Sequence, residues 1–411
     1  MRTSVAVLVE LVRDAGAGGH VKCWERFAEA AARDDPGVDL TVYVLGDRDT
    51  VDPLSDTVRF VALRPMLGSG PLARLLGGVY ATDLAPRHPG LAVRLRKHDV
   101  WHLTHSFAFA GTAVRLAGRL PERPGMVCSL HTDVPVLTAA YLRQMRMPGT
   151  VADAGAALAR RRRNRLLRAC DRVLVATAPE RGEVEAIVGP GRVSPLGRGV
   201  DLGRFRPDPA ARARLAGRYG LRDTETLVLF AGRVDASKRV MVAGEAVRRL
   251  RADGRDVRLV VAGSGAAAEP LSALLGDGVV LLGRLAQDDL ARVYAGCDVL
   301  AFPSESETIG NVVAEAMACG LPVVLPEVAL TTTWLAAHGR DGVVVRRDDA
   351  DGWAREIAAL ADDPARRAAM GRAALATSRR RHRSWGRVLA EDLLPVWQEA
   401  AGRQVVRRAT S

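Results

Sequence analysis

The sequence contains few cysteines, and their spacing follows no recognisable pattern. There are five of them in 411 residues, an odd number without any Cys-x-x-Cys pair: Cys23, Cys128, Cys170, Cys297 and Cys319. Disulfide frameworks use even sets of cysteines, and zinc sites use short characteristic spacings. The pattern therefore argues against both kinds of site, and we expect a cytoplasmic protein in a reducing compartment.

Aromatic residues and long apolar segments are also scarce. Aromatic side chains make up 4% of the chain and do not alternate with basic ones, as they do in many nucleic-acid-binding segments. We therefore expect no nucleic-acid partner. No apolar run reaches the roughly 18 residues that a membrane-spanning helix needs, so any membrane contact should be peripheral.

Lysine is the third scarce residue type. Lys22, Lys97 and Lys238 are the only lysines among 59 basic residues, so arginine serves nearly everywhere that a positive charge is needed. Lys238 is therefore a candidate for a specific geometric role. With 47 acidic residues, the formal net charge is +12, which favours anionic partners such as sugar nucleotides or lipid head groups.

The sequence does contain a regular alternation of short buried-strand patterns with helical patterns. This alternation predicts an α/β fold built from doubly wound parallel sheets. Strands are expected at 4–9, 39–45, 58–63, 100–103, 126–130 and 172–176, and again at 227–230, 257–261, 279–282, 299–302, 322–325 and 342–345.

A chain of 411 residues exceeds what one hydrophobic core usually fills, so we expect two Rossmann-like domains that enclose a cleft. The turn-rich segment 195–207 marks the boundary between them. We accordingly divide the chain into residues 1–200, residues 201–383 and a C-terminal amphipathic helix, 384–411, whose end from 402 is expected to be frayed.

One segment, 301–324, carries most of the chemical information. It is typical of a buried strand, a polar loop, a helix over about 310–319, a glycine stop and a second buried strand. Two carboxylates, Glu307 before the helix and Glu315 within it, flank a helix N-terminus whose unpaired backbone N–H groups form an anion site. We therefore expect a phosphate between them. The ordinary alternative is a helix cap and a solvated helix residue.

Glu307 and Glu315, framed by Phe-Pro-Ser and by Glu-Ala-Met-Ala-Cys-Gly-Leu-Pro-Val-Val, resemble the signature of the retaining nucleotide-sugar glycosyltransferases of family 4. The resemblance implies the GT-B fold, two Rossmann-like domains facing a cleft. It also implies that Glu315 holds the donor ribose and that Glu307 faces the sugar. The amides between them would bind the diphosphate: Thr308, Ile309, Gly310 and Asn311.

A second element follows the first expected strand of the second half. The segment 231–238, with Arg233 and Lys238, resembles the Gly-Arg…Lys element of the same family, which clamps the donor diphosphate. Arginine offers a planar fork and lysine a compact point charge, so the pair can hold a pyrophosphate from two sides. The alternative is a pair of surface charges.

His131 follows the expected strand 126–130, so it should emerge at the carboxyl end of a parallel strand, where open α/β sheets bind ligands. The His-Thr-Asp sequence resembles members of the family in which this histidine touches the donor sugar. A satisfied buried histidine is the alternative. Gly18 and Gly19 open a helix after the first strand and are expected to line the cleft near the sugar and acceptor.

Other candidates are weaker or depart from the family pattern. Arg284 and Leu285 are expected to contact the base through their backbone. Leu330, Thr331 and Trp334 stand where the family usually has two glycines and a glutamate. His102 and His105 should face opposite sides of a strand, which argues against a shared metal, and Asp47-Arg48-Asp49 is typical of a turn.

These resemblances imply a metal-independent, retaining transfer of a hexosyl group from a UDP- or GDP-sugar to a lipid or small-molecule acceptor, without any other cofactor. The expected catalytic groups are His131, Arg233, Lys238 and Glu307, and residues 1–200 would bind the acceptor, 201–383 the donor. A GT-B phosphorylase, an epimerase and a non-catalytic nucleotide-sugar-binding protein remain alternatives.

The acceptor side suggests a membrane. Arg161, Arg165 and Arg168 share one face of an expected helix, and 63–97 is a second basic and apolar stretch. Such surfaces can bind the anionic inner face of a membrane peripherally, although a charge run more often marks a solvated helix face.

Overall fold

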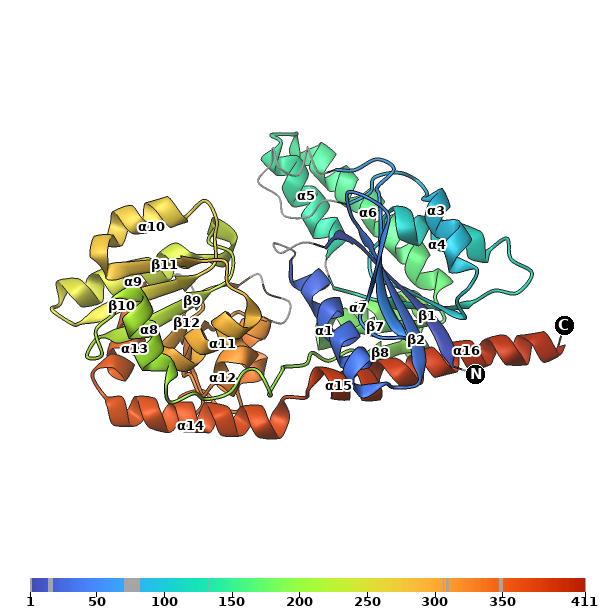
Figure 1. Ribbon diagram of the computed structural model, residues 1–411. Coiled ribbons are helices and arrows are strands. Elements are labelled where there is room, and N and C mark those ends of the chain that lie inside the picture. The colour runs from blue at the N-terminus through green and yellow to red at the C-terminus, as the bar shows by residue number, and fades with distance from the viewer. Residues whose placement is uncertain are drawn as a thin grey trace. The chain divides into compact units, whose positions relative to one another are not determined.

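The computed structural model describes residues 2–13, 18–69, 82–131, 133–305, 307, 310–346 and 350–410; of residues 144 and 403–410 only the backbone is described. The chain divides into two compact units (Figure 1). Unit 1 comprises Met1–Arg198 together with Trp385–Ser411, and unit 2 comprises Gly199–Ser384. Each unit is built on a mainly parallel sheet with helices on both faces, as the alternating pattern predicted.

Unit 1 contains an eight-stranded sheet in the order β3-β4-β2-β1-β5-β6-β7-β8. Every neighbouring pair is parallel except β3 with β4. Because both faces are covered, β1 carries a continuous buried run from Val5 to Leu11. The strands span Thr3–Val12 (β1), Val38–Leu45 (β2), Thr50–Pro53 (β3), Val58–Leu63 (β4), Val100–Leu103 (β5), Gly125–Ser129 (β6), Arg172–Val175 (β7) and Val193–Pro195 (β8).

Helices give unit 1 one core on each face of the sheet. One core surrounds Trp24, Phe27 and Trp397, and the other surrounds Trp101 and Phe109. The first is covered by α1 (Gly19–Asp34), α15 (Trp385–Val388) and α16 (Leu394–Thr410); the second by α3 (Pro89–Leu95), α4 (Ala108–Ala117), α6 (Gly149–Ala169) and α7 (Ala178–Val188). The strands β3 and β8 were not expected, because both are short and occupy the edges of the sheet.

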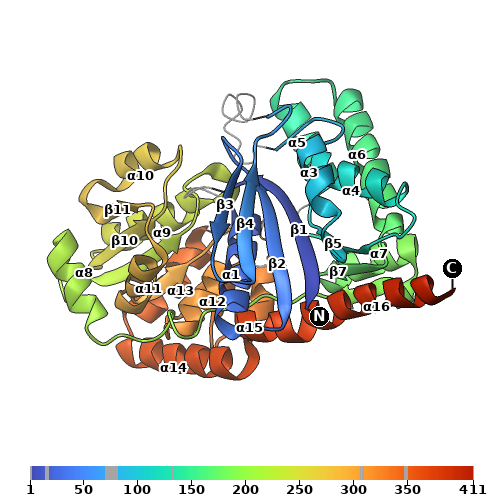
Figure 2. The ribbon, with the colours of Figure 1, turned by 45° about the vertical axis from the view of Figure 1, so that its right-hand side comes forward.

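The C-terminal segment returns to unit 1 and completes its first core. A π-helical turn, Leu389–Leu393, joins α15 to α16, and α16 contacts β6 and β1 (Figure 2). A Cβ on Gly125 of β6 would lie 2.7 Å from the backbone of Ala400, so glycine permits this close approach. Helical backbone continues to Thr410 as part of α16.

Unit 2 contains a six-stranded sheet in the order β11-β10-β9-β12-β13-β14, parallel throughout its described pairs. The strands span Thr226–Ala231 (β9), Val257–Ala262 (β10), Val279–Gly283 (β11), Val299–Ala301 (β12), Val323–Pro326 (β13) and Val343–Val345 (β14). One face is covered by α9 (Val240–Ala252), α10 (Ala268–Leu275) and α13 (Ala350–Ala361); the other by α8 (Ala211–Tyr219), α11 (Gln287–Gly296), α12 (Asn311–Ala318) and α14 (Pro364–Arg381).

In both sheets the direction in which successive strands are added reverses between two interior strands. In unit 1 the reversal lies between β1 and β5, and in unit 2 it lies between β9 and β12. Loops that leave the carboxyl ends of two such strands run in opposite directions and leave room for a ligand between them. The segments that the sequence singled out follow these strands: Arg233 and Lys238 follow β9, and Glu307 follows β12.

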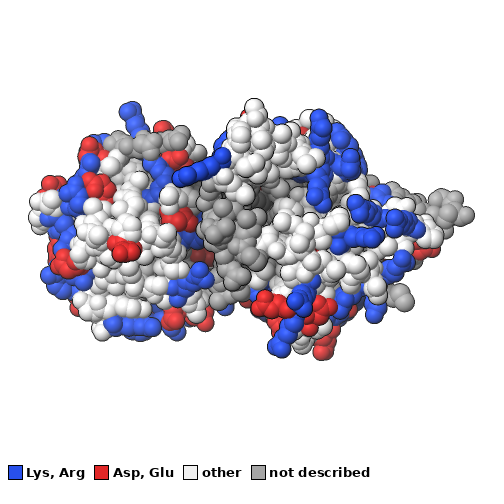
Figure 3. Space-filling view, turned by 90° about the horizontal axis from the view of Figure 1, so that it is seen from above, with Lys and Arg blue, Asp and Glu red and all other residues white. Residues whose placement is uncertain are grey.

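One surface of unit 1 carries exposed apolar side chains together with many arginines. It is formed by α5 (Val134–Gln144), the loop after it and α6, and we call it the α5–α6 surface. Its exposed apolar side chains are Val136, Met145, Met147, Val151 and Leu158, and its exposed arginines are Arg143, Arg146, Arg160, Arg161, Arg162, Arg165 and Arg168. Figure 3 shows basic side chains beside a broad uncharged area on this unit. Among the described residues, no helix has the length and apolar character to cross a bilayer.

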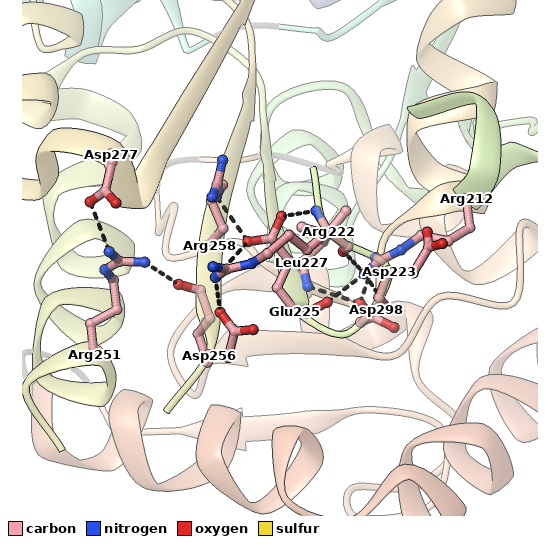
Figure 4. Close-up of polar contacts among 11 residues, drawn as sticks. Arg212, Arg222, Asp223, Glu225, Leu227, Arg251, Asp256, Arg258, Asp277 and Asp298 are labelled. Carbon is pink, nitrogen blue, oxygen red and sulfur yellow. Dashed lines mark hydrogen bonds and ion pairs between the residues drawn. The ribbon is translucent and has the colours of Figure 1, made fainter. Parts of the chain in front are cut away.

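An ionic network around the buried Glu225 holds the amino ends of the strands in unit 2 (Figure 4). Glu225 is 1% exposed, accepts the backbone N–H of Arg222 at 2.8 Å and lies 3.0 Å from Nε of Arg258. Asp298 accepts the N–H of Leu227 at 2.8 Å and pairs with Arg212 at 2.9 Å. These contacts tie β9, β10 and β12 together at the end of the sheet opposite the loops that carry Lys238 and Glu307.

Candidate active site

In unit 2 the structure brings two of the predicted site residues into direct contact. Lys238 ends the short 3₁₀ turn Ala236–Lys238, and its Nζ lies 2.5 Å from Oε1 of Glu307. The two side chains are 14% and 23% exposed, so the ion pair is partly shielded from water. Loops that are far apart in sequence therefore place a cation and a carboxylate together at the reversal point of the sheet.

Arg233 lies in the same loop as Lys238 and is held by its neighbours. Its Nη1 is 2.8 Å from Oδ2 of Asp235, and its Nη2 donates to Oγ of Ser237 at 2.9 Å. Oδ1 of Asp235 accepts the backbone N–H of Lys238 at 3.2 Å and so closes the turn. One aspartate thus orients both cations, although no sequence motif assigned it a role.

A Gly-Ser-Gly loop after β10 supports the Arg233 loop, and the sequence analysis missed it. A Cβ on Gly263 would lie 1.8 Å from O of Gly232, so only glycine allows this approach. The N–H of Val234 donates to O of Ser264 at 3.0 Å, and Oγ of Ser264 accepts from Nε of Arg284 at 2.8 Å. The signal was present as two glycines directly after a strand. Leu285 follows Arg284, partly buried, before α11.

The helix α12 begins as expected, with a glycine in the left-handed conformation. Gly310 has φ 65°, and a Cβ there would lie 2.4 Å from Cγ2 of Thr331. Thr331 is fully buried in the 3₁₀ turn Leu330–Trp334, so this residue, one of those that depart from the family pattern, packs beneath the start of α12. Asn311 is the first residue of the helix. Thr308 and Ile309 lie outside the described residues.

Glu315 is positioned from within the core of unit 2. Oη of Tyr294, on α11, donates to Oε2 of Glu315 at 3.2 Å. Tyr294 is fully buried, and this burial raises the pKa of its hydroxyl well above the usual value, so the hydroxyl remains a donor. No sequence motif pointed to Tyr294, because its role depends on α11 packing against α12.

In unit 1 the predicted His131 lies in a group of stacked histidines. His20 stacks on it with ring centroids 4.4 Å apart and planes 11° apart, and His105 stacks on His20 at 5.8 Å. Burial lowers the pKa of His105 to about 4 and those of His20 and His131 well below the ordinary value. All three rings are therefore neutral near pH 7, and they lie after β1, β5 and β6 at the reversal point of this sheet.

Both ring nitrogens of His131 have partners. Nε2 lies 2.7 Å from Oγ of Ser129, and Nδ1 lies 2.8 Å from Nη2 of Arg198. Arg198 also donates to Sγ of Cys23 at 3.1 Å. The alternative of a satisfied buried histidine therefore describes this ring, and Arg198 would have to leave Nδ1 before a ligand could bind there.

Two glycines stand at the start of α1, directly before His20. Gly18 caps the helix and Gly19 begins it, and a Cβ on Gly19 would meet no described atom within 4 Å. Packing therefore does not require glycine there, which is consistent with a position that lines a binding space. Nε2 of His20, the next residue, donates to Oγ1 of Thr104 at 2.8 Å, because the hydroxyl of Thr104 itself donates to O of Leu8 at 2.9 Å.

Glu10 is a buried carboxyl group that the sequence analysis did not single out. It has φ 58°, a conformation that non-glycine residues rarely adopt, and it is fully buried. Its carboxyl oxygens accept the N–H groups of Phe107 at 3.2 Å and Phe109 at 2.6 Å, at the start of α4. Burial raises its pKa to about 8 despite these hydrogen bonds.

The candidates for metal ligands have other roles among the described residues. Oδ1 of Asp49 accepts the N–H of Arg64 at 3.0 Å, and Oδ2 pairs with Arg94 at 3.2 Å, in the bend between β2 and β3. His102 lies in β5 with its ring in the core, while His105 stacks near His20. No three His, Cys, Asp or Glu side chains in the described ranges gather in an arrangement that could hold a metal ion.

Known proteins resemble the chain over both units. The family described as Glycosyltransferase Family 4 matches residues 17–204, and Glycosyl transferases group 1 matches 225–363. A D-inositol 3-phosphate glycosyltransferase of Kineococcus radiotolerans is 30% identical, covering 96% of this chain and 93% of that protein. A similarly named enzyme of Catenulispora acidiphila is 32% identical, covering 82% of this chain and 81% of that protein. One of Stackebrandtia nassauensis is 38% identical over 53% of this chain and 51% of its own length.

Solved structures with low sequence identity share the fold. Sucrose-phosphate synthase of Thermosynechococcus elongatus superposes with a TM-score of 0.70 at 21% identity, covering all of both chains. Anabaena HepE, in complex with UDP and glucose, superposes with a TM-score of 0.68 at 17% identity, covering 98% of this chain and 99% of that one. Both likenesses concern the course of the backbone.

Proposed function

The chain belongs to the family 4 glycosyltransferases, and from this membership we propose that it moves a hexosyl group from a UDP- or GDP-sugar to a small-molecule or lipid acceptor with retention of configuration. The observation that carries the proposal is the pairing of Lys238 with Glu307 at the reversal point of the unit 2 sheet, 2.5 Å apart. Arg233 stands in the same loop, and the N-terminus of α12 follows Glu307.

The proposed chemistry depends on charge that develops on the leaving diphosphate. Fixed cations and helix N–H groups stabilise such charge best when they are already in place, because little reorganisation is then needed. Lys238, Arg233 and the N–H groups of Gly310 and Asn311 would supply this stabilisation. A diphosphate would compete with Glu307 for Lys238 and release the carboxylate toward the sugar.

The remaining site residues would orient the donor. Glu315, held by Tyr294 at 3.2 Å, would accept hydrogen bonds from the ribose hydroxyls. His131, with Gly18 and Gly19 nearby in unit 1, would face the sugar and acceptor. Arg284 and Leu285 would contact the base through their backbone. We propose no covalent nucleophile, because the family resemblance implies attack by the acceptor on the same face as the leaving group.

The relatives suggest which acceptor to test first. Several are named D-inositol 3-phosphate glycosyltransferases, so a cyclitol phosphate is the first candidate. An anionic acceptor also agrees with the net charge of +12. A lipid acceptor is the second candidate, supported by the apolar and basic α5–α6 surface, and it would bring the protein to the inner face of a membrane.

The test is transfer of label from UDP- and GDP-sugars to inositol 3-phosphate, to other small acceptors and to extracted anionic lipids. Each reaction is run with EDTA and with Mn²⁺. We expect transfer that survives EDTA, since Arg233 and Lys238 would take the place of a metal on the diphosphate, and the anomeric configuration of the product should match that of the donor.

The outcomes separate the alternatives. Product formed without any acceptor would favour a phosphorylase or an epimerase. Nucleotide binding without turnover under every condition would favour a non-catalytic binding protein. Activity that depends on Mn²⁺ would contradict the metal-independent mechanism.

A further inference from the structure

A line of hydrogen-bonded side chains crosses the core of unit 1 from the C-terminal helix to His131. Nε1 of Trp397 donates to Nδ1 of His102 at 3.0 Å. Nε2 of His102 lies 2.8 Å from Oγ of Ser129, which lies 2.7 Å from Nε2 of His131. Trp397, His102 and Ser129 are fully buried, and His131 is 8% exposed. The line therefore joins α16, β5 and β6 through contacts that water does not reach.

The proton positions at the tryptophan end follow from chemistry. An indole N–H can only donate, so Nδ1 of His102 must accept. Burial lowers the pKa of His102 to about 3, so the ring is neutral and carries its single proton on Nε2. His102 therefore donates to Oγ of Ser129.

The opposite end is fixed by Arg198. A guanidinium group can only donate, so Nδ1 of His131, 2.8 Å from Nη2 of Arg198, must accept. Since the ring is neutral, its proton lies on Nε2 and is also donated to Ser129. Oγ of Ser129 thus receives two N–H groups, while its own hydroxyl proton has no acceptor among the described residues. A buried donor without an acceptor is unfavourable.

We propose that Arg198 sets the tautomer of His131, and that Trp397, His102 and Ser129 reverse this tautomer when Arg198 leaves Nδ1. The hydroxyl of Ser129 then donates to Nε2 of His131, and the ring carries its proton on Nδ1. Nδ1, vacated by Arg198, takes up one proton from water, and the proton on Nε2 is lost to water when a local opening exposes that nitrogen, so the ring stays neutral. Every member of the line then has a partner, and His131 presents an N–H donor.

The packing around His131 favours a change of tautomer over a rotation of the ring. His20 is stacked on the ring at 4.4 Å with planes 11° apart, and Trp24 lies edge-on to the same ring at 6.0 Å. The inference rests on the proposed function in one respect: the oxygen that would accept from Nδ1 is a hydroxyl of the donor sugar. In that case Trp397, His102 and Ser129 are positioning residues, and Arg198 occupies the place of the sugar oxygen.

The tautomer can be measured without any substrate. The full chain is labelled with ¹⁵N-histidine, and long-range ¹H–¹⁵N spectra report which ring nitrogen carries the proton; a His131→Asn variant assigns the signal. We expect the Nε2–H form in the wild type and in Arg198→Lys, because lysine also only donates. We expect the Nδ1–H form in Arg198→Met. An unchanged Nε2–H form in Arg198→Met, or Nδ1–H in the wild type, overturns the proposal.

The role of the line itself needs a second pair of variants. When Trp397→Phe is added to Arg198→Met, Nδ1 of His102 loses its donor and can carry the ring proton itself. Ser129 can then donate to Nε2 of His102 instead of His131, and we expect His131 to show a mixture of both tautomers. Adding Ser129→Ala to Arg198→Met should give the same mixture, which covers the case in which the tryptophan variant does not fold. A pure Nδ1–H form in every folded double variant would contradict the role of the line.

Kinetics then connects the line to turnover. With a donor and acceptor identified, Trp397→Phe alone should lower kcat by about tenfold and leave the donor KM unchanged, because one supporting hydrogen bond is lost away from the substrate. Equal effects on KM and kcat would mean that the substitution only disturbs packing. If the spectra behave as expected but no sugar nucleotide is turned over, the proposed function fails while the tautomer switch stands.

Discussion

At the scale of single residues, the donor side of the site depends on two cations with different partners. Lys238 is paired with Glu307, whereas Arg233 is held by Asp235 and Ser237 within its own loop. Both would have to bind a diphosphate in the proposed reaction. Their separate partners make their contributions measurable one at a time.

We expect Lys238→Ala and Arg233→Ala each to lower kcat/KM by about 10²-fold or more, the scale of losing one group that stabilises developing charge. Steady-state kinetics with the identified donor measures this. Arg248→Ala is the matched control, because Arg248 lies on α9 and its ion-pair partner among the described residues is Glu245, on the surface. Wild-type kinetics in both site variants would show that neither residue binds the diphosphate.

The two glutamates should differ in how they affect nucleotide binding. Glu315→Gln should weaken binding of free UDP or GDP, because an amide offers one acceptor where the carboxylate offers two. Glu307→Gln should leave nucleotide binding equal or tighter, because Lys238 loses its counter-ion, while turnover falls. Calorimetry with both nucleotides measures the difference. Equal losses of affinity would refute this division of roles.

At the scale of secondary-structure elements, the two ends of the unit 2 sheet have different roles. The carboxyl ends of β9 and β12 lead to Lys238 and Glu307, whereas their amino ends are tied by Glu225, Asp298 and their arginines. The ionic network should therefore contribute to stability without affecting ligand binding.

We expect Glu225→Ala to destabilise unit 2 by about 3 kcal/mol, because removing one partner of a buried ion pair leaves the other charge uncompensated. Denaturant unfolding measures the loss, and calorimetry should find unchanged nucleotide affinity in the folded fraction. Asp277→Ala is the control, since its carboxylate is 83% exposed where it pairs with Arg251. A loss below about 0.5 kcal/mol would mean that water reaches the network.

The α5–α6 surface supports a prediction about membranes. Its arginines Arg161, Arg162 and Arg165 have no acidic partner among the described residues, and Leu158 beside them is 69% exposed. Each basic residue near an anionic bilayer contributes on the order of 1 kcal/mol, and the apolar side chain can insert.

We expect the protein to sediment with phosphatidylglycerol vesicles. This binding should weaken as salt is added and should be lost when these three arginines are changed to serine. Phosphatidylcholine vesicles provide the control for charge, and Leu158→Ser should reduce binding less than the arginine changes. If the protein stays in the supernatant even at low salt, the lipid acceptor becomes untenable and the soluble acceptor remains.

At the scale of the whole molecule, buried ionisable groups are concentrated in unit 1. Burial lowers the pKa of His102 to about 3 and of His98 and His105 to about 4, from an ordinary value of 6.5. Glu10 behaves in the opposite way, with its pKa raised by burial from 4.5 to about 8. These shifts determine how stability responds to pH.

We expect the stability of unit 1 to be greatest near pH 6.5. Below this pH the histidines of the unfolded chain take up protons, whereas His98 and His102 of the folded chain stay neutral until about pH 4 and pH 3. The unfolded state therefore binds more protons, and stability is lost as the pH falls. Above it the unfolded Glu10 has already released a proton that the folded residue holds to about pH 8, so stability also declines.

Hydrogen exchange of β1, β5 and β6 across this range measures the effect separately from unit 2. Glu10→Gln should remove the decline on the alkaline side, and His105→Asn should reduce the decline on the acid side. A stability that does not change between pH 4.5 and 8 would contradict the assignment of these groups as buried and neutral.

The sequence by itself determined the fold class, most strands and the donor motif, because these depend on local patterns. The strand 58–63 and the strand 100–103 have the predicted ends, since apolar runs bounded by turns leave little choice of pairing. The segment with Glu307 and Glu315 carries its chemistry in one short stretch, so its family could be identified before any contact was known.

Only the tertiary structure decided which distant residues meet. Tyr294 reaches Glu315 because α11 packs beside α12, and Trp397 reaches His102 because α16 returns to the first sheet. Neither contact leaves a periodic or spaced signal along the chain, since each joins positions brought together by packing rather than by chain proximity. The same holds for Arg198, whose position at His131 is set by the fold and whose neighbours in sequence give no sign of it.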